Sequence, residues 1–164
     1  GVIGRPLPMP VLEAGIPTAT RLAATGRDAF SDAAHAILTT DTGIPAVGAI
    51  SRRTDSPVED VIFGFGAHLD VRTAVLRAVT EMNQFMPAVM QRNPDGSTAY
   101  MYGDPDALAW WTRATVATQP YLLPSRTVPL RRAADYPSLS SSDPAEDVRT
   151  CVRIARGLGL RVEA

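Results

Sequence analysis

The most regular pattern of hydrophobic and polar positions lies between residues 70 and 86. Apolar side chains recur there at three- and four-residue spacing, beginning with Val71 and ending with Met86. This spacing predicts an amphipathic helix. Asp70 is a favourable N-cap residue, and Pro87 is predicted to end the helix. The polar face of this helix carries Thr73, Arg77, Thr80, Glu81 and Gln84.

Three shorter segments upstream of this helix predict strands, at residues 33–40, 46–51 and 61–65. The first strand leads into a turn signal, Thr40-Asp41-Thr42-Gly43. The third strand runs directly into the helix through Gly64-Phe65-Gly66-Ala67-His68. Together these elements predict an α/β fold in which a mixed sheet is flanked by helices.

A second helix is predicted to start at Asp104 and Pro105, which have the residue types of an N-cap and a first helical position. Its apolar residues are Leu108, Trp110, Trp111 and Val116. Adjacent helix positions cannot both face the core, so we expect one of the two tryptophans to be exposed.

A third helix is predicted after residue 142, because Asp143-Pro144-Ala145-Glu146 forms a capping-box pattern. It is expected to end at Gly157 or Gly159, since glycine commonly follows the last helical turn. Residues 160–163 predict the start of another strand. The intervening residues 119–142 contain four prolines and are expected to be mostly loop.

Two regions differ in composition along the chain. Residues 1–32 are rich in proline and predict an extended arm with a short helix. Residues 33–164 carry the predicted sheet and helices. Because the last predicted strand is short, we expect the chain to stop in the middle of a fold.

The charges exclude several classes of function. The 164 residues carry a net charge of -1, and all 16 basic residues are arginine. The even balance offers no basic surface for nucleic acid or for a membrane. Without lysine, the chain cannot form a Walker A phosphate loop, a protein-kinase site or a Schiff base. No apolar run is long enough for a membrane helix, and no secretory signal is visible.

The single cysteine, Cys151, cannot form an internal disulfide or a structural zinc site. Its neighbourhood has a helical pattern that places it on a stripe with Val148, Val152 and Ala155. We therefore interpret Cys151 as a buried structural thiol, and a reducing, cytoplasmic setting fits this cysteine usage.

The junction between the third strand and the long helix carries the candidate chemistry. Gly64 and Gly66 allow a close approach of backbone at this point. Glu81 and Gln84 are three residues apart, so they lie on one helix face. A carboxylate and an amide oxygen at this spacing can both reach one magnesium ion. The alternative is a solvated face in which Arg77, one turn earlier, pairs with Glu81.

The same segment resembles the signature of the YcaO family, in its ATP-dependent, azoline-forming cyclodehydratase branch. The matching residues are Gly64-Phe65-Gly66-Ala67-His68-Leu69-Asp70-Val71-Arg72, Ala74, Leu76-Arg77-Ala78 and Glu81-Met82-Asn83-Gln84. The resemblance implies that Glu81 and Gln84 bind magnesium and the ATP phosphates, with His68 and Arg77 as candidate site-lining residues. The chain departs from many relatives at Phe85, where they have arginine.

Such enzymes use ATP to activate backbone amides of ribosomally synthesised precursor peptides, which gives thiazoline or oxazoline rings. The resemblance therefore also implies a leader-peptide-binding partner protein or domain, and self-association into a homo-oligomer stays open. No counterpart of the family's second acidic motif is visible in residues 1–32. We expect a partial YcaO-like domain that is inactive as a catalyst on its own.

Two other interpretations stay open. The chain is alternatively a non-catalytic YcaO-like module that binds peptide or completes a partner subunit. A small α/β domain with accidental similarity would be favoured if Glu81 and Gln84 pointed away from any cleft.

Overall fold

The computed structural model describes residues 32–37, 42–101, 103–122 and 132–162. Three strands form one sheet in the order β1-β2-β3, with β1 at Asp32–Ile37, β2 at Ala46–Arg52 and β3 at Ile62–Ala67. Both pairings are antiparallel. The α/β class is confirmed, but the described strands do not form the mixed sheet that was predicted. The short connections explain this, because a parallel crossover needs a dozen or more residues.

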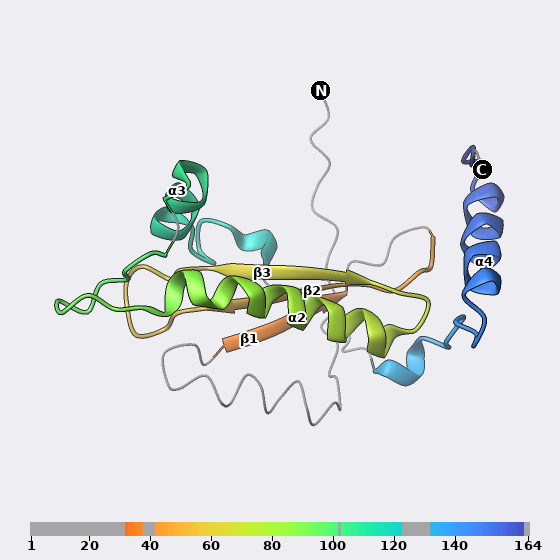
Figure 1. The fold of residues 1–164 in the computed structure, drawn as a ribbon, viewed down its shortest axis with the longest axis horizontal. Helices are drawn as coiled ribbons and strands as arrows, with labels where there is room; N and C mark the ends of the chain where they lie inside the picture. Colours follow the sequence, from red (N-terminus) through yellow and green to blue (C-terminus); the bar gives the residue numbers. More distant parts are fainter. Residues whose placement is uncertain (1–31, 38–41, 102, 123–131, 163–164) are drawn as a thin grey trace.

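Helix α2 (Val71–Met90) lies along one face of the sheet (Figure 1). Register places Val47 of β2 beside Gly66 of β3, and Ala49 beside Gly64. The side of the sheet that carries these residues faces the apolar stripe of α2. The main core is formed by Val47, Ala49, Ile62, Val71, Ala74, Val75, Ala78, Val79, Met82, Ala88, Val89 and Trp111.

The opposite face of the sheet carries a smaller cluster. Ile50, Val61 and Leu122 are buried there, and Phe63 and Trp110 pack against them. Leu122 belongs to the short 3-10 helix η1 (Pro120–Leu122), which follows α3 (Pro105–Arg113). Downstream lie η2 (Ala133–Asp135) and α4 (Pro144–Gly157). Both faces of the sheet are therefore apolar, and α2 covers the larger core.

Pro87 does not end α2, contrary to the prediction. The helix continues to Met90, because the turn after the proline is fixed by tertiary contacts. Ala88 and Val89 are fully buried in the main core, and the Ala88 carbonyl accepts a hydrogen bond of 3.1 Å from the Met101 backbone N–H. Burial of these residues offsets the loss of a helical hydrogen bond at proline.

The helix starts are confirmed at all three predicted positions. The side chains of Asp70, Asp104 and Asp143 each accept a backbone N–H bond at the start of α2, α3 and α4. Helix α3 ends at Arg113, so Val116 lies outside it.

The end of α4 matches one prediction and contradicts another. Gly159 has a φ of 77°, and the Leu160 N–H returns to the Ala155 carbonyl at 3.0 Å. Such a bond closes a helix end. The prediction of a strand at residues 160–163 is wrong for Leu160 to Val162, which are not in a strand.

Two predictions fall partly outside the described residues. The arm at residues 1–32 falls almost entirely there, and so do residues 123–131 of the loop predicted at residues 119–142. Within the described residues, no helix has the length and apolarity needed to cross a membrane.

Candidate nucleotide and metal face

The glycines of β3 allow α2 to lie directly on the strand backbone. A Cβ atom at Gly64 would collide with the backbone nitrogen of Met82 and lie 2.5 Å from the Ala78 carbonyl oxygen. A Cβ atom at Gly66 would meet the Ala74 carbonyl oxygen and lie 2.6 Å from the Ala78 nitrogen. The close approach expected from the sequence is confirmed, and the neighbour is the helix that carries the candidate site.

This contact fixes the carboxylate of Glu81. The Oε2 atom of Glu81 accepts a hydrogen bond of 2.5 Å from the backbone N–H of Phe65, which lies between the two glycines. Glu81 is half-buried, and Oε1 accepts no hydrogen bond within the described residues. The strand thus orients the carboxylate and leaves one oxygen available to a ligand.

Gln84 lies three residues after Glu81 on the same face and is exposed. A carboxylate oxygen and an amide oxygen have the right chemistry for magnesium, which commonly takes one or two protein ligands and completes its shell with phosphate and water. In the part of the chain that the structure describes, no group of three or more His, Cys, Asp or Glu side chains could hold a metal ion. The described residues therefore fit part of a magnesium–nucleotide site.

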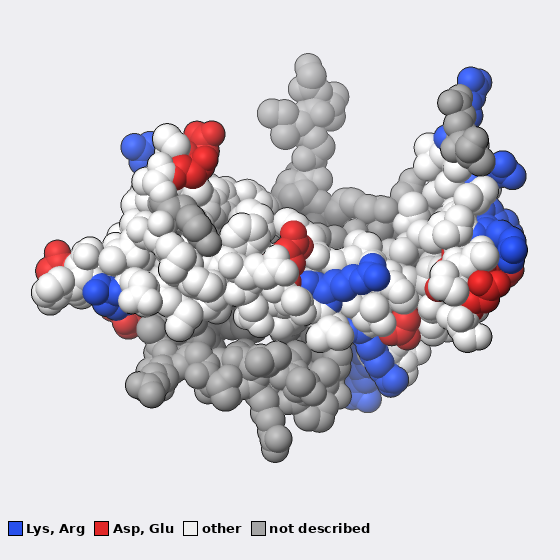
Figure 2. Space-filling view, in the orientation of Figure 1, with Lys and Arg blue, Asp and Glu red and all other residues white. Residues whose placement is uncertain are grey.

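Arg77 does not pair with Glu81 among the described residues. Its Nη1 atom instead donates a 3.0 Å hydrogen bond to the carbonyl of Ala67, at the end of β3. This bond keeps the exposed Arg77 guanidinium close to the end of β3. Figure 2 shows that charged side chains are sparse over α2 and gather along α4.

His68 stabilises the turn between β3 and α2. Its Nδ1 atom accepts a 3.0 Å hydrogen bond from the Asp70 N–H, and its own backbone N–H donates to the Pro45 carbonyl at 3.1 Å. Asp70 in turn caps α2, and the hydrogen bond from the Thr73 backbone N–H lowers the pKa of the Asp70 carboxyl. These contacts agree with a turn-stabilising role for His68.

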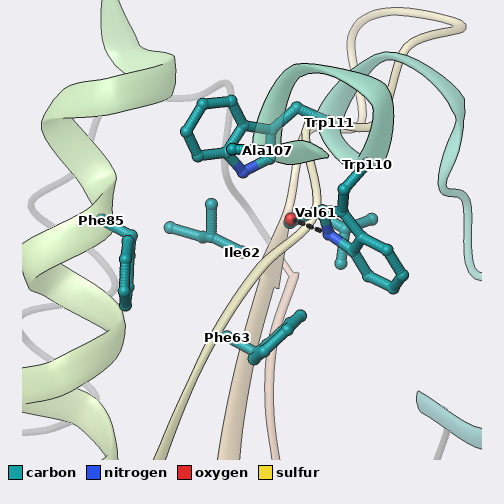
Figure 3. Close-up of a pocket in the computed structure, with 7 residues that line it drawn as sticks. All are labelled: Val61, Ile62, Phe63, Phe85, Ala107, Trp110 and Trp111. Atoms are coloured by element: carbon teal, nitrogen blue, oxygen red, sulfur yellow. Dashed lines mark hydrogen bonds between the residues drawn. The ribbon is translucent and has the colours of Figure 1, made fainter. Parts of the chain in front are cut away.

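An apolar pocket of about 210 Å³ opens between Phe85 of α2, the start of β3 and helix α3 (Figure 3). Phe85 of α2 points toward it from one side, and Phe63 and Trp110 line it from the other. The rings of Phe63 and Trp110 meet edge to face, with centroids 5.6 Å apart. The full lining is Val61, Ile62, Phe63, Phe85, Ala107, Trp110 and Trp111.

Trp110 is half-buried and Trp111 is buried, so neither tryptophan is exposed in the way expected from the sequence. The indole N–H of Trp110 donates a 2.9 Å hydrogen bond to the Val61 carbonyl, which ties α3 to the start of β3. Since this donor is satisfied within the chain, the pocket offers almost entirely apolar surface. The signal in the sequence was Phe85, a bulky member of the apolar series predicted for this helix.

A family model described as YcaO cyclodehydratase, ATP- and Mg2+-binding, matches residues 2–163. The chain belongs to the YcaO family. The resemblance inferred from the segment that joins β3 to α2 is therefore confirmed over nearly the whole sequence.

Two solved structures resemble this YcaO chain closely. The heterocyclase TruD is 35% identical, with a TM-score of 0.77, and the match covers 93% of this chain and 20% of TruD. A heterocyclase solved in complex with substrate and cofactor is 39% identical, with a TM-score of 0.79 and the same coverage. The YcaO chain thus spans about a fifth of the length of each. No curated protein matches it.

A buried polar network in the YcaO chain holds the loops beside the pocket. Asp60, fully buried with a φ of 45°, accepts hydrogen bonds from the hydroxyls of Thr98 and Tyr100, the latter at 2.7 Å. Arg53 lies 3.8 Å from Asp60 and forms two hydrogen bonds to Asp55. The ring of Tyr100 stacks on Trp111. Sequence reasoning missed this network, because its members are far apart along the chain.

Cys151 is exposed on α4, so the prediction of a buried thiol is wrong. The stripe of Val148, Cys151, Val152 and Ala155 exists, but no residue of α4 is buried. A helical apolar pattern indicates which side of a helix can be covered. It does not show that a neighbour is present.

Proposed function

We propose that the Glu81–Gln84 face of α2 contributes ligands to the ATP–magnesium site of a YcaO-type peptide cyclodehydratase. The observation that carries the proposal is the bond between Glu81 and the Phe65 N–H. This bond orients a carboxylate without consuming its second oxygen. The family description names ATP and magnesium, and one similar heterocyclase was solved with a cofactor.

Glu81 and Gln84 would hold the metal ion, each through one oxygen. ATP, when bound, supplies the phosphoryl group that activates an amide oxygen of the peptide. The chain's own contribution is positioning, because β3 and its glycines fix the helix that presents both oxygens. Positioning and charge stabilisation account for most of the catalysis in phosphoryl transfer.

Arg77 is the candidate for a contact to phosphate. Arg77 lies one helical turn before Glu81, and its guanidinium has donors beyond the one bonded to Ala67. Phe85 stands where many relatives have arginine, so a second cation is absent from that position of α2. The proposed face therefore offers one arginine and two oxygen ligands.

Calorimetric titration of magnesium–ATP into the folded chain tests the metal and nucleotide role. Glu81→Gln keeps an oxygen that can accept the Phe65 N–H, so the fold should persist while the charge is removed. Glu146→Gln, in the exposed first turn of α4, is the matched control. We expect binding to the chain and to Glu146→Gln, and at least a tenfold loss in Glu81→Gln. Equal binding by all three would refute the assignment.

The substrate proposed for the whole activity is a ribosomally synthesised peptide, in which thiazoline or oxazoline rings form after attack by a Cys, Ser or Thr side chain. A leader-peptide-binding partner and a cytoplasmic setting belong to the same proposal. We propose that the chain alone does not complete the reaction, since the described residues supply only part of a magnesium shell. Mass spectrometry would detect the loss of one water per ring; such loss with the chain alone would contradict this.

The apolar pocket favours a second candidate, a module that binds a peptide side chain without catalysis. Its walls are aromatic, and the Trp110 N–H is already bonded within the chain. Aromatic walls of this kind suit an apolar or aromatic side chain of a peptide.

Both tryptophans of the chain line this pocket, so intrinsic fluorescence reports on it selectively. Titration with a peptide that carries a phenylalanine should change the emission. Phe85→Ala should weaken this response several-fold, whereas Leu76→Ala, also exposed on α2, should leave it unchanged. An unchanged emission at saturating peptide would remove this candidate.

A further inference from the structure

The apolar pocket meets the buried polar network at Val61. This residue lines the pocket, and its carbonyl accepts the indole N–H of Trp110 at 2.9 Å. The preceding residue, Asp60, is fully buried and is the one non-glycine residue among those described that has a positive φ, at 45°. A backbone conformation of this kind is strained and persists where the surrounding contacts determine it. The contacts of the Asp60 side chain therefore fix the backbone that leads into the pocket wall.

Those contacts return to the pocket through its other wall. The Asp60 Oδ1 atom accepts a 2.7 Å hydrogen bond from the Tyr100 hydroxyl. The Tyr100 ring stacks on Trp111, with centroids 5.7 Å apart and an angle of 9° between the ring planes. Trp111 lines the pocket and follows Trp110 directly in α3. The contacts thus form a closed circuit, which runs from Asp60 through Tyr100 and the two tryptophans to Val61 and back.

This contact circuit holds the aromatic walls of the pocket in place before anything binds. Trp110 is held by its N–H bond and by the edge-to-face contact with Phe63, and Trp111 is held by the stack on Tyr100. Aromatic pairs are stabilised in specific edge-to-face or offset arrangements. Walls that are fixed in advance have little left to order when a ligand enters. Such a pocket favours a rigid aromatic occupant over an aliphatic one.

We propose that Tyr100 and Asp60 are positioning residues that set the selectivity of the pocket for an aromatic side chain of a peptide. Neither residue lines the pocket, so both act through Trp111 and Val61. This inference rests on the second candidate function, the binding of a peptide side chain. It goes beyond that function by naming the preferred class of side chain and the buried groups that enforce the preference.

Thr98 provides a matched control for Tyr100. It is buried, and its hydroxyl donates to the other oxygen of the same Asp60 carboxylate. Thr98→Val and Tyr100→Phe therefore each remove one hydroxyl donor from Asp60 and keep the shape of the side chain. The two variants differ because the Tyr100 hydroxyl is carried by a ring that stacks on a tryptophan of the pocket.

Fluorescence titration with two pentapeptides tests the selectivity. The peptides carry phenylalanine or leucine at the centre and glycine elsewhere, and both tryptophans of the chain report on the pocket. We expect the unsubstituted chain and Thr98→Val to prefer the phenylalanine peptide by the same factor. In Tyr100→Phe this factor should fall about threefold or more, as the loss of a specific aromatic geometry allows.

The ratio of the two affinities separates positioning from a purely structural role. Partial unfolding lowers both apparent affinities by the same fraction, so it leaves their ratio unchanged. An equal ratio in all three proteins, or an equal fall in both variants, would overturn the proposal. If neither peptide changes the emission of the unsubstituted chain, the candidate pocket function fails and the selectivity role falls with it.

Acrylamide quenching of the tryptophan emission tests the positioning without a ligand. Loss of the Tyr100 hydroxyl frees its ring to move away from Trp111, so quenching should increase in Tyr100→Phe. Thr98→Val leaves the bond between Tyr100 and Asp60 in place and should be quenched like the unsubstituted chain. Equal quenching of both variants would refute the positioning role of Tyr100, whatever the peptides do.

Discussion

Replacing Gly64 by alanine is expected to separate α2 from β3. The new Cβ atom would meet three backbone atoms of α2, the nearest being the Met82 nitrogen, with the Ala78 oxygen at 2.5 Å and the Glu81 carbonyl carbon at 2.8 Å. Ordinary van der Waals contact begins at 3.4 Å. The helix must therefore move by about 0.9 Å or more, the difference between 3.4 Å and 2.5 Å, because backbone cannot rotate away as a side chain can.

The energetic consequence follows from the packing of α2. Overpacking a core costs about 1–3 kcal/mol, and a backbone obstruction belongs at the upper end of this range. The lower entropy of alanine in the unfolded chain offsets about 0.4–1 kcal/mol. The net destabilisation expected is therefore about 2 kcal/mol. The displacement also lengthens the bond from the Phe65 N–H to Glu81, so it disturbs the proposed metal ligand.

Urea unfolding followed by tryptophan fluorescence measures this effect. With a slope of about 2 kcal/mol per molar urea, the midpoint should fall by about 1 M. Gly103→Ala is the control, because a Cβ atom there meets nothing within 4 Å. Amide exchange at Phe65 should also accelerate in Gly64→Ala. Equal midpoints for the two variants would show that α2 does not rest on the β3 backbone as described.

Three further predictions address features away from this contact. Tyr100→Phe removes a donor from the buried Asp60 and should destabilise the chain by about 1.5–3 kcal/mol in urea unfolding, whereas Tyr121→Phe, 48% exposed, should have little effect. The pKa of Asp70 is lowered by a backbone N–H bond, so its stabilising contribution is present above the unfolded pKa of about 3.9 and is lost as the pH falls through the lower folded pKa. As the pH is lowered from neutral, the urea midpoint should therefore fall less in Asp70→Asn than in the unsubstituted chain, because asparagine keeps the cap without a titrating carboxyl. An identical fall in both would contradict this. Cys151 should react with a disulfide reagent in the folded chain nearly as fast as in denaturant; strong protection would contradict its exposure.

The helix starts and the signature segment could be predicted from the sequence because their signals are local. An N-cap carboxylate such as Asp70 bonds to a backbone N–H three residues later, so no distant contact is needed. The spacing of Glu81 and Gln84 likewise fixes a common helix face. The short connections between the strands could also have indicated antiparallel pairing, which the prediction of a mixed sheet overlooked.

The remaining features depend on residues that are far apart along the chain. Whether Pro87 ends α2 is decided by burial of the turn that follows it, and the orientation of Glu81 is decided by a backbone N–H of β3. The pocket forms only when α3 brings Trp110 to Val61. The spacing of apolar residues along the chain carries no information on these contacts between distant segments.

The amino-acid sequence by itself determined the family, the three helix starts and the face on which the proposed ligands lie. Each of these rests on residue types at short and regular spacing. Only the tertiary structure decided that the glycines seat α2 on the strand, that Asp60 is buried among hydroxyls, and that Cys151 is exposed. The physical reason is that burial is a property of neighbours in space, and the pattern of one helix specifies which side can be covered without specifying what covers it.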